Sequence, residues 1–397
     1  MRTGGYRWVP SVLVPVVVLG LVLLNSPSAD ANVNLPARTA AQVVALAAGS
    51  PFLQFSGEVT KTANLGLPAI SSLPNVSQAS VDQLKKTLPK SMSQFIPKAS
   101  VQGNLATVLG FLSGTQQANV YYNNPLMMRV QILDPMSERD FIVNGTDVWY
   151  YDALQQTVEH SSASPFAQLP VSSRFLGWLG SGFSSSPLGT LAPASVGSFF
   201  LSHLGATTTV RLGPNVSVAG RGAYQLMLTP TEKGTLVSSV AIAVDGQTGL
   251  PLRVVINAVG QSAPAFSVEF NSVTFGASDP SMFAFSPPVG ATVNQVALPS
   301  LAVLTSRSLP SVVKGVAGAI GARGQKLAPA GWATVVEIPR SLSLGQNFAS
   351  NPYFKTLTKP VTGGRVFVTP LFEVLFEKDG RVFAGAVSTQ RLVQAAR

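Results

Sequence analysis

The chain has 397 residues, with 27 Lys and Arg against 17 Asp and Glu, two His and no Cys. A chain of this length supports a large core, and the absence of Cys excludes disulfide frameworks, thiol nucleophiles and Cys-ligated zinc or iron–sulfur sites. Only 11% of the residues are charged, far below the roughly 25% that is usual for soluble domains, so the composition is not that of an ordinary cytosolic enzyme.

The first 31 residues have the pattern of a secretory signal peptide. Arg2 and Arg7 precede an apolar run over 9–24, and a small-residue cleavage site ends at Ala31. We therefore expect an exported protein, periplasmic, in the cell envelope or extracellular, from which residues 1–31 are removed. The alternative is a membrane anchor through residues 9–24, although this run is shorter than the roughly 20 residues that a spanning helix needs.

The positive charge of the chain indicates the chemistry of its partners. The net charge is +10 at pH 7, which favours anionic partners such as a phospholipid surface or envelope polymers. The export signal disfavours nucleic acid, so we predict no nucleic-acid partner.

Many segments alternate apolar and polar side chains, which is the period of a strand with one buried face. They lie at 52–60, 128–132, 139–143, 148–151, 224–228, 240–244, 252–256 and 266–270. Asn144-Gly145 and the segment 245–249 are turn signals between consecutive strands. Such short turns leave no room for the crossover helices that parallel pairs need. The sequence predicts an α+β protein with one large curved antiparallel β-sheet, a half-barrel packed around helices.

Two long connections interrupt this sheet. The first, 61–118, contains an amphipathic pattern over 80–88 that predicts a short helix capped by Ser80. The second, 161–206, carries Arg174 as its one charge at neutral pH and scatters aromatic side chains among serines.

The composition of 161–206 is typical of a lid, and the lid candidates are Phe175, Trp178 and Phe199. The alternative is a pair of core helices, because a start at Pro193 followed by Phe199 and Phe200 is typical of a helix that buries one side.

The strand pattern stops between Phe285 and Pro299, where we place a domain boundary. The half-barrel domain then covers 32–298, and a small α+β C-terminal domain covers 299–397. In the second domain the pattern predicts helices at 301–320 and 388–396, the latter capped by Ser388, and strands at 331–339, 365–368, 372–376 and 382–387.

Residue types that perform catalysis do not converge in this chain. His160 and His203 have no second His or carboxylate at metal-ligand spacing. Asp140 and Asp147 are the acids that a hydrolase would use, but acids beside turns are common and need no reaction. We therefore predict no catalytic residue, no metal, no cofactor and no enzymatic activity.

The apolar phase of the strands is the candidate ligand site. A wide antiparallel sheet curls, so its inner face can line a hollow, and a buried acyl chain gains about 0.8 kcal/mol per CH₂. The ligand-binding candidates on this hydrophobic concave face are Met128, Val130, Ile132, Phe141, Val143, Leu226, Leu228, Ile242, Val254, Ile256 and Phe270. The alternative is that the connections 61–118 and 161–206 fill the hollow as core.

Several segments resemble the LolA-like lipoprotein-carrier superfamily, over about residues 45–295. They are Gly57-Glu-Val-Thr60, Arg129-Val-Gln-Ile-Leu-Asp134, Asp140-Phe-Ile-Val-Asn-Gly-Thr-Asp-Val-Trp-Tyr150, Tyr224-Gln-Leu-Met-Leu-Thr-Pro230, Val240-Ala-Ile-Ala-Val-Asp-Gly-Gln-Thr-Gly-Leu-Pro-Leu-Arg-Val254 and Phe283-Ala-Phe-Ser-Pro-Pro288. The most specific is the turn from Asp245 to Arg253, with Thr, Leu-Pro-Leu and Arg at fixed offsets.

The resemblance implies a half-barrel whose hollow holds acyl chains, and it carries over no reactive residue. Arg129, Trp149 and Arg253 are site candidates by strand position. The chain lacks the lipid-attachment Cys of LppX-type carriers, and its two connections are longer. The segment from Gly331, with the hairpin and helix after it, is similar to the small C-terminal domain of the MucB/RseB branch, which senses lipoproteins and restrains an anti-sigma factor.

The sequence therefore predicts an exported, non-enzymatic carrier that binds a lipid or lipoprotein acyl chain. The alternative is an envelope sensor that resembles MucB/RseB and binds a membrane anti-sigma partner. Besides the lipid, the partners that these two functions imply are a membrane protein or an anionic membrane surface.

Overall fold

The computed structural model describes residues 33–49, 53–67, 113–124, 126–134, 137–162, 192–202, 204–295, 331–338 and 354–397. The predicted signal or anchor, the helices expected at 80–88 and 301–320, His203 and the lid candidates Phe175 and Trp178 lie outside these residues. None of the helices in the described ranges has the length and hydropathy that a bilayer-spanning helix needs.

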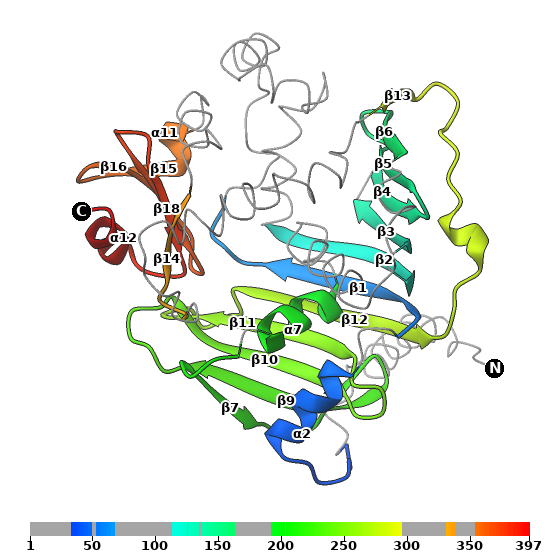
Figure 1. The fold of residues 1–397 in the computed structure, drawn as a ribbon, viewed down its shortest axis with the longest axis horizontal. Coiled ribbons are helices and arrows are strands. Elements are labelled where there is room, and N and C mark those ends of the chain that lie inside the picture. Colours follow the sequence, from blue (N-terminus) through cyan, green and yellow to red (C-terminus); the bar gives the residue numbers. More distant parts are fainter. Residues whose placement is uncertain are drawn as a thin grey trace, which may run out of the picture.

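The main body is one open sheet of 13 strands (Figure 1). Their order is β13-β6-β5-β4-β3-β2-β1-β12-β11-β10-β9-β7, with β8 paired to β9. The strands are β1 (Phe55–Ala63), β2 (Gly114–Asn124), β3 (Met127–Asp134), β4 (Ser137–Asn144), β5 (Asp147–Asp152), β6 (Thr157–Ser162), β7 (Thr208–Leu212), β8 (Val216–Val218), β9 (Arg221–Pro230), β10 (Val237–Asp245), β11 (Pro251–Ala258), β12 (Phe266–Phe275) and β13 (Thr292–Gln295). All pairs are antiparallel except β13 with β6, which confirms the predicted α+β class and the large antiparallel sheet.

Two helices cover one face of the sheet over β9–β12, which we call the inner face. α2 (Ala40–Ala48) begins with a capping box, in which Thr39 and Gln42 exchange hydrogen bonds between side chain and backbone. α7 (Pro193–Ser202) confirms the predicted helix start at Pro193 and lies on β11. The fit is close, because a Cβ added to Gly197 would lie 2.6 Å from Pro251 Cβ.

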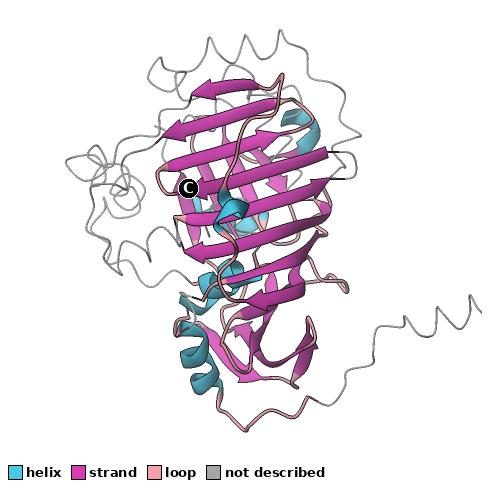
Figure 2. Ribbon diagram, turned by 90° about the vertical axis from the view of Figure 1, so that its right-hand side faces the viewer, coloured by secondary structure: helices cyan, strands magenta, loops and turns pink. Residues whose placement is uncertain are grey.

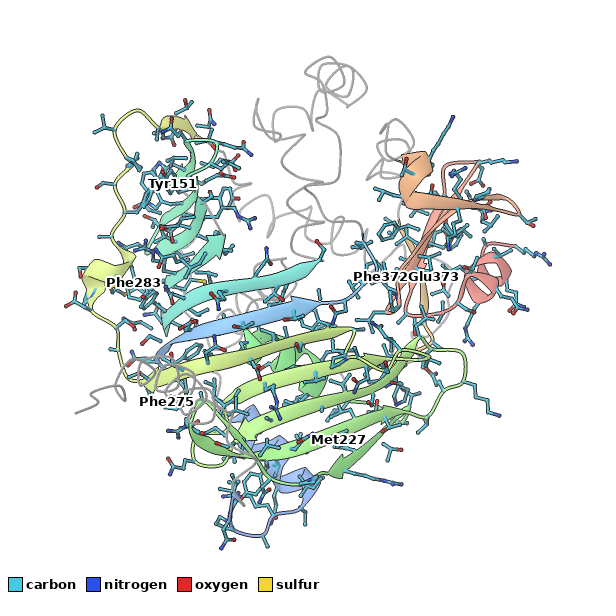
Figure 3. All side chains as sticks on the ribbon, turned by 180° about the vertical axis from the view of Figure 1, so that it is seen from behind. Tyr151, Met227, Phe275, Phe283, Phe372 and Glu373 are labelled. Carbon is cyan, nitrogen blue, oxygen red and sulfur yellow. The ribbon has the colours of Figure 1, made fainter. Side chains whose placement is uncertain are left out.

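The opposite, outer face of β3–β6 is covered by residues 276–291, which we call the strap. Figure 2 shows it crossing the strands with its short 3-10 helix η3 (Pro280–Phe283), and Figure 3 labels Phe283 in it and Tyr151 on β5. Phe283 is fully buried, and Phe285 packs against Trp149 and Tyr151. The strap brings β13 beside β6, which explains the one parallel pair.

Residues 331–397 contain a second sheet of five strands, all antiparallel, in the order β14-β18-β17-β16-β15. Its elements are β14 (Val335–Ile338), α11 (Phe354–Leu357), β15 (Thr358–Val361), β16 (Gly364–Val368), β17 (Glu373–Glu377), β18 (Val382–Gly385) and α12 (Thr389–Ala395). The terminal helix is confirmed with Ser388 at its N-cap position, although the Ser388 side chain makes no capping hydrogen bond. The domain boundary predicted at 298/299 falls outside the described residues.

The two sheets contact each other through backbone and side chains. Thr235 and Val387 form an isolated antiparallel bridge, and Leu236 N donates to Ala386 O at 2.7 Å. Trp332 Nε1 donates to Thr208 Oγ1 at 2.8 Å. These contacts hold the small sheet against the β9–β10 end of the large one.

Candidate functional site: an amphipathic inner face

The strand register places all eleven predicted ligand-binding residues on the inner face. Directly paired residues of antiparallel strands point to the same side. Leu226 pairs with Ile242, Ile242 with Val254 and Val254 with Val268. From there the same side continues through Phe270–Val59, Val59–Ala118, Ala118–Ile132 and Val130–Phe141.

The part of this face under α2 and α7 is packed core. Leu226, Leu228, Ile242 and Val254 have no exposed surface and belong to one cluster with Val43 and Ala47 of α2 and Val196 and Phe200 of α7. Ile256 packs against the same cluster. The helix at the end of the 161–206 connection therefore fills the hollow here, and a ligand role for these positions stays a prediction. Phe199 lies on α7 with its side chain exposed, and its role as a lid is likewise untested.

The inner face of β1–β6 carries three adjacent rows of apolar side chains, which we call the apolar rows. Part of it is packed as well, since Val120 and Val130 belong to a second core cluster with Leu252 and Phe270. Each row consists of residues paired from strand to strand. The rows contain Val59, Ala118 and Ile132; Val120, Val130, Phe141 and Tyr150; and Tyr122, Met128, Val143 and Val148. Val130 and Ile132 are fully buried, and Phe141 is half-buried.

At one end of these rows the same face becomes polar. Lys61 is fully buried and stands in register between Val268 and Gln116. Gln116 is 9% exposed, and its buried Oε1 has no hydrogen-bond partner. Arg139 pairs with Ile132 on one side and with Asp152 on the other. We call Lys61, Gln116, Arg139 and Asp152 the polar end.

Burial dominates the electrostatics of this half of the face. It lowers the pKa of Lys61 to about 8, and the nearby charge of Arg139 lowers it further. It raises the pKa of both Tyr122 and Tyr150 to about 12, and it raises the pKa of Glu159. Each of these net shifts favours the neutral form, as expected for a face shielded from water.

The sequence prediction named five residues of the apolar rows and did not name Lys61, Gln116 or Arg139. The five are Met128, Val130, Ile132, Phe141 and Val143. A signal was present for the two cations. Lys61 occupies the same strand phase as Val59, and Arg139 that of Phe141, so each is a charge at a position where alternation predicts an apolar residue. Their common location follows only from the register.

The polar candidates on the outer face hold the strap and the hairpins. Arg129 forms two hydrogen bonds to Asp140, at 2.6 and 3.1 Å, and donates to Met282 O at 3.2 Å. His160 stacks on Trp149 at 3.6 Å, and its Nε2 lies 2.8 Å from Asp147 Oδ1. Asp140 and Asp147 thus belong to two separate pairs and do not converge as a hydrolase would require. The described residues contain no group of three His, Asp or Glu that could hold a metal ion.

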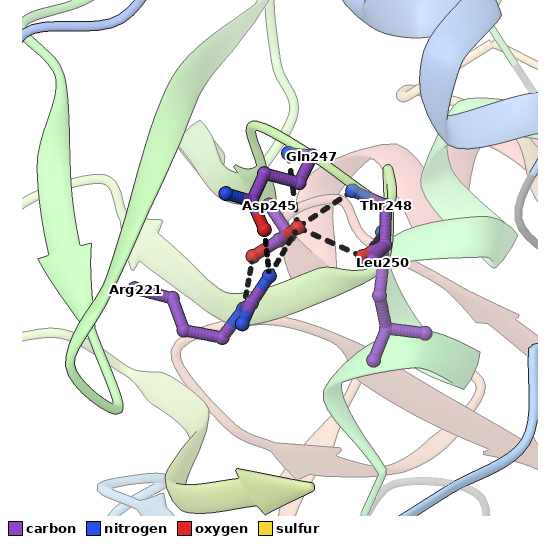
Figure 4. Close-up of polar contacts among 5 residues, drawn as sticks. All are labelled: Arg221, Asp245, Gln247, Thr248 and Leu250. Carbon is purple, nitrogen blue, oxygen red and sulfur yellow. Dashed lines mark hydrogen bonds and ion pairs between the residues drawn. The ribbon is translucent and has the colours of Figure 1, made fainter. Parts of the chain in front are cut away.

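The turn that carries the family resemblance is a structural unit (Figure 4). Asp245 Oδ1 accepts hydrogen bonds from Gln247 N, Thr248 N and Thr248 Oγ1 at 2.7–3.0 Å. Arg221 Nε donates to its Oδ2 at 2.5 Å. Burial by itself would raise the pKa of Asp245, but the bonds from Arg221 and Thr248 hold it below the usual value. Arg253, the last residue of the motif, lies 3.9 Å from Glu269, away from the inner face.

The fold and site define a protein with an open, curved sheet whose inner face is apolar along three rows and polar at one end. No family model and no curated protein matches the chain. The MucA/MucB complex of Pseudomonas aeruginosa is similar at 12% identity, over 90% of this chain and 96% of that one, with a TM-score of 0.39. An uncharacterized conserved protein from Thermus thermophilus is similar at 12%, over 64% and 98%, with 0.32.

A LolA superfamily protein from Nitrosomonas europaea is similar at 11% identity, over 63% of this chain and 99% of that one, with a TM-score of 0.23. At these values the similarities do not identify a function. The chemistry of the inner face has to supply the functional argument.

Proposed function

We propose that this protein is an exported, non-enzymatic carrier that binds a lipid or lipoprotein acyl chain along the apolar rows of β1–β6. One observation carries the proposal: the register joins three rows of apolar side chains to a polar end on the same face of one sheet. This arrangement matches an amphiphile, with the acyl chain on the rows and the polar group at Lys61 and Arg139.

The energetics of such binding are adequate. About ten methylene groups buried against the rows would gain about 8 kcal/mol, which corresponds to micromolar affinity before the cost of association is subtracted. Val130 is already 1% exposed and Ile132 has no exposed surface. An acyl chain therefore enters only in a second, more open state of the protein, and the difference in affinity between the two states governs uptake and release.

The test is native mass spectrometry of protein purified from its own host, followed by organic extraction. We expect a bound lipid in the wild type and less of it in Phe141→Gln, which places an amide on the middle apolar row. Tyr151→Gln is the matched control, because Tyr151 is a half-buried aromatic residue on the outer face of the adjacent strand. Preparations without any lipid, or equal losses in the two variants, would count against a carrier.

The second candidate function is a sensor that binds a membrane-protein partner through the small domain. It is favoured by a cleft of about 500 Å³ where the two sheets meet, lined by Glu232 of the β9–β10 loop and by Thr334, Arg391 and Gln394 of the small domain. For a sensor, we expect a single-pass membrane protein to copurify with the wild-type chain but not with the Arg391→Glu variant. Lys355→Glu, an exposed charge reversal on α11, should retain it, and retention by both variants would remove the cleft from consideration.

A further inference from the structure

We propose that the protein pairs with a second copy of itself through β13 (Thr292–Gln295), the strand at one end of the large sheet. The two copies of β13 lie antiparallel across a twofold axis and join the two large sheets edge to edge. This inference goes beyond the proposed function and does not depend on it. It rests on the open edge of β13, on the lack of charge there and on the apolar side chains around it.

The outer edge of β13 presents unpaired backbone groups. β13 is the last strand in the order of the large sheet, beside β6, and no other strand in the described ranges pairs with it (Figure 1). Thr292 N donates to Gln156 O at 2.9 Å, toward the β6 side. Backbone groups of successive residues in a strand point to opposite edges, so the N–H and C=O of Val293 face the open edge. Such groups are a template for a further strand.

The other three strands that end the two sheets carry features that hinder this kind of pairing. β7 carries Arg211, β14 carries Glu337, and β15 carries Lys359 beside Pro360. Charged residues and proline on an edge strand are a common protection against pairing with another chain. The sequence of β13 is Thr-Val-Asn-Gln, with neither a charge nor a proline. Of these four strands, β13 is therefore the one whose edge accepts a partner strand.

The surface around β13 is apolar and uncharged. Val293 is 43% exposed, Val289 in the strap is fully exposed, and Leu154 in the adjoining β5–β6 turn is 78% exposed. Neither 280–295 nor 153–158 contains a charged residue. Burying these apolar side chains against a partner removes them from water, which favours association.

A second copy of the chain is the partner that fits this edge. The net charge of +10 makes two copies repel each other wherever their charged surfaces meet, so an uncharged edge is where they approach at the lowest cost. A lipid bilayer does not fit, because its hydrocarbon region cannot satisfy the backbone groups of an open edge. A strongly charged partner does not fit either, because this surface offers no opposite charge.

The register of the pair follows from the directions of the backbone groups. Residues that face the open edge form the hydrogen-bonded pairs of an antiparallel ladder, so a twofold axis at Val293 pairs this residue with Val293 of the second copy. Both side chains then lie on the outer face, where Val293 is in register with the buried Val158. Thr292 faces Asn294 of the second copy on the inner face. Apolar residues thus meet apolar ones, and polar residues meet polar ones.

Sedimentation equilibrium of the purified protein over a range of concentrations measures the association. Because β13 is short, we expect a reversible monomer–dimer equilibrium of the weak kind that small interfaces give. Val293→Lys places two like charges opposite each other and should raise the dissociation constant about tenfold or more. Leu212→Lys is the matched control and should keep the wild-type value, because Leu212 is a 36% exposed apolar residue on β7, at the other end of the same sheet.

Chemical cross-linking locates the contact independently of the affinity. The chain contains no Cys, so Val293→Cys introduces a single thiol, and the Cα atoms of a hydrogen-bonded pair lie about 5.5 Å apart. A short bifunctional thiol reagent should therefore link Val293→Cys into a covalent dimer and leave Leu212→Cys monomeric.

Three results would overturn the proposal. A wild type that stays monomeric at every concentration is the result expected if the edge of β13 receives a strand of a different protein instead. A dimer whose dissociation constant is unchanged in Val293→Lys has its interface elsewhere. Equal cross-linking of Val293→Cys and Leu212→Cys would show that the contact is not specific to β13.

Discussion

Replacing the buried Lys61 by Met should stabilise the lipid-free protein at neutral pH. Burial, with a contribution from Arg139, lowers the pKa of Lys61 from 10.5 to about 8. One pKa unit corresponds to about 1.4 kcal/mol, so the charged side chain costs about 3 kcal/mol of stability at pH 7. Met has a similar volume and no charge, and it removes this cost without opening a cavity.

The pH dependence has a definite sign. Below pH 8 Lys61 is protonated in the folded and the unfolded chain, and the full cost is present. Between about pH 8 and 10.5 the folded chain has lost this proton while the unfolded chain still binds it, so the wild type gains stability as the pH rises. The advantage of Lys61→Met should therefore shrink by about 3 kcal/mol over this range.

Urea denaturation of wild type and variant at a series of pH values measures the difference in the free energy of unfolding. Lys233→Met removes the same charge from an exposed loop and serves as the control, with a change within about 0.5 kcal/mol at every pH. A stability difference between wild type and Lys61→Met that stays constant from pH 7 to 10.5 would refute the assignment of Lys61 to a desolvated site. So would a loss of stability in the variant at pH 7.

Three further outcomes follow from the packing and the turns. Asp245→Asn should lose about 2–4 kcal/mol in urea denaturation because it breaks a buried charged network, whereas Asp379→Asn, at an exposed Asp–Arg pair, should lose less than about 1 kcal/mol; equal losses would show that burial is not the cause. Gly197→Ala should lower the melting temperature despite the better helix propensity of Ala, since its Cβ meets β11 at 2.6 Å, with a net loss of about 1 kcal/mol. Gly205→Ala has open space around its Cβ and should change the melting temperature little, so a matching drop would contradict the clash. Ile242→Ala, under α7, should lose about 2–5 kcal/mol in the same urea assay, and a loss below about 1 kcal/mol would mean that this core is loosely packed.

Alternation predicted most strands of the large sheet and the residues that share its buried side, because a strand's side-chain period is local. Met128, Val130 and Ile132 show this directly. The hairpin across Asn144-Gly145 was equally predictable from the sequence. Gly145 adopts a φ of 62° there, which Gly tolerates without strain. The parallel pairing of β13 with β6 could not be predicted from the sequence, because it depends on where the strap crosses the outer face.

The candidate site was likewise predictable from the sequence only in part. Its apolar rows follow from alternation, but the polar end requires strands from separate parts of the chain to be brought into register. Lys61 and Gln116 are opposite each other because β1 pairs with β2, and no local pattern specifies that pairing. The sequence also could not show whether Leu226 and Ile242 are packed core or open to a ligand, because this depends on α7 lying against them.

The sequence by itself determined the α+β class, the antiparallel strands and the apolar side that they share, since these depend on the order of neighbouring residues. Only the tertiary structure decided which half of that side is filled by helices and which half carries two cations beside three apolar rows. The physical reason is that strand register and helix docking are set by contacts between distant segments, and these contacts place Lys61, Gln116 and Arg139 on one shielded face.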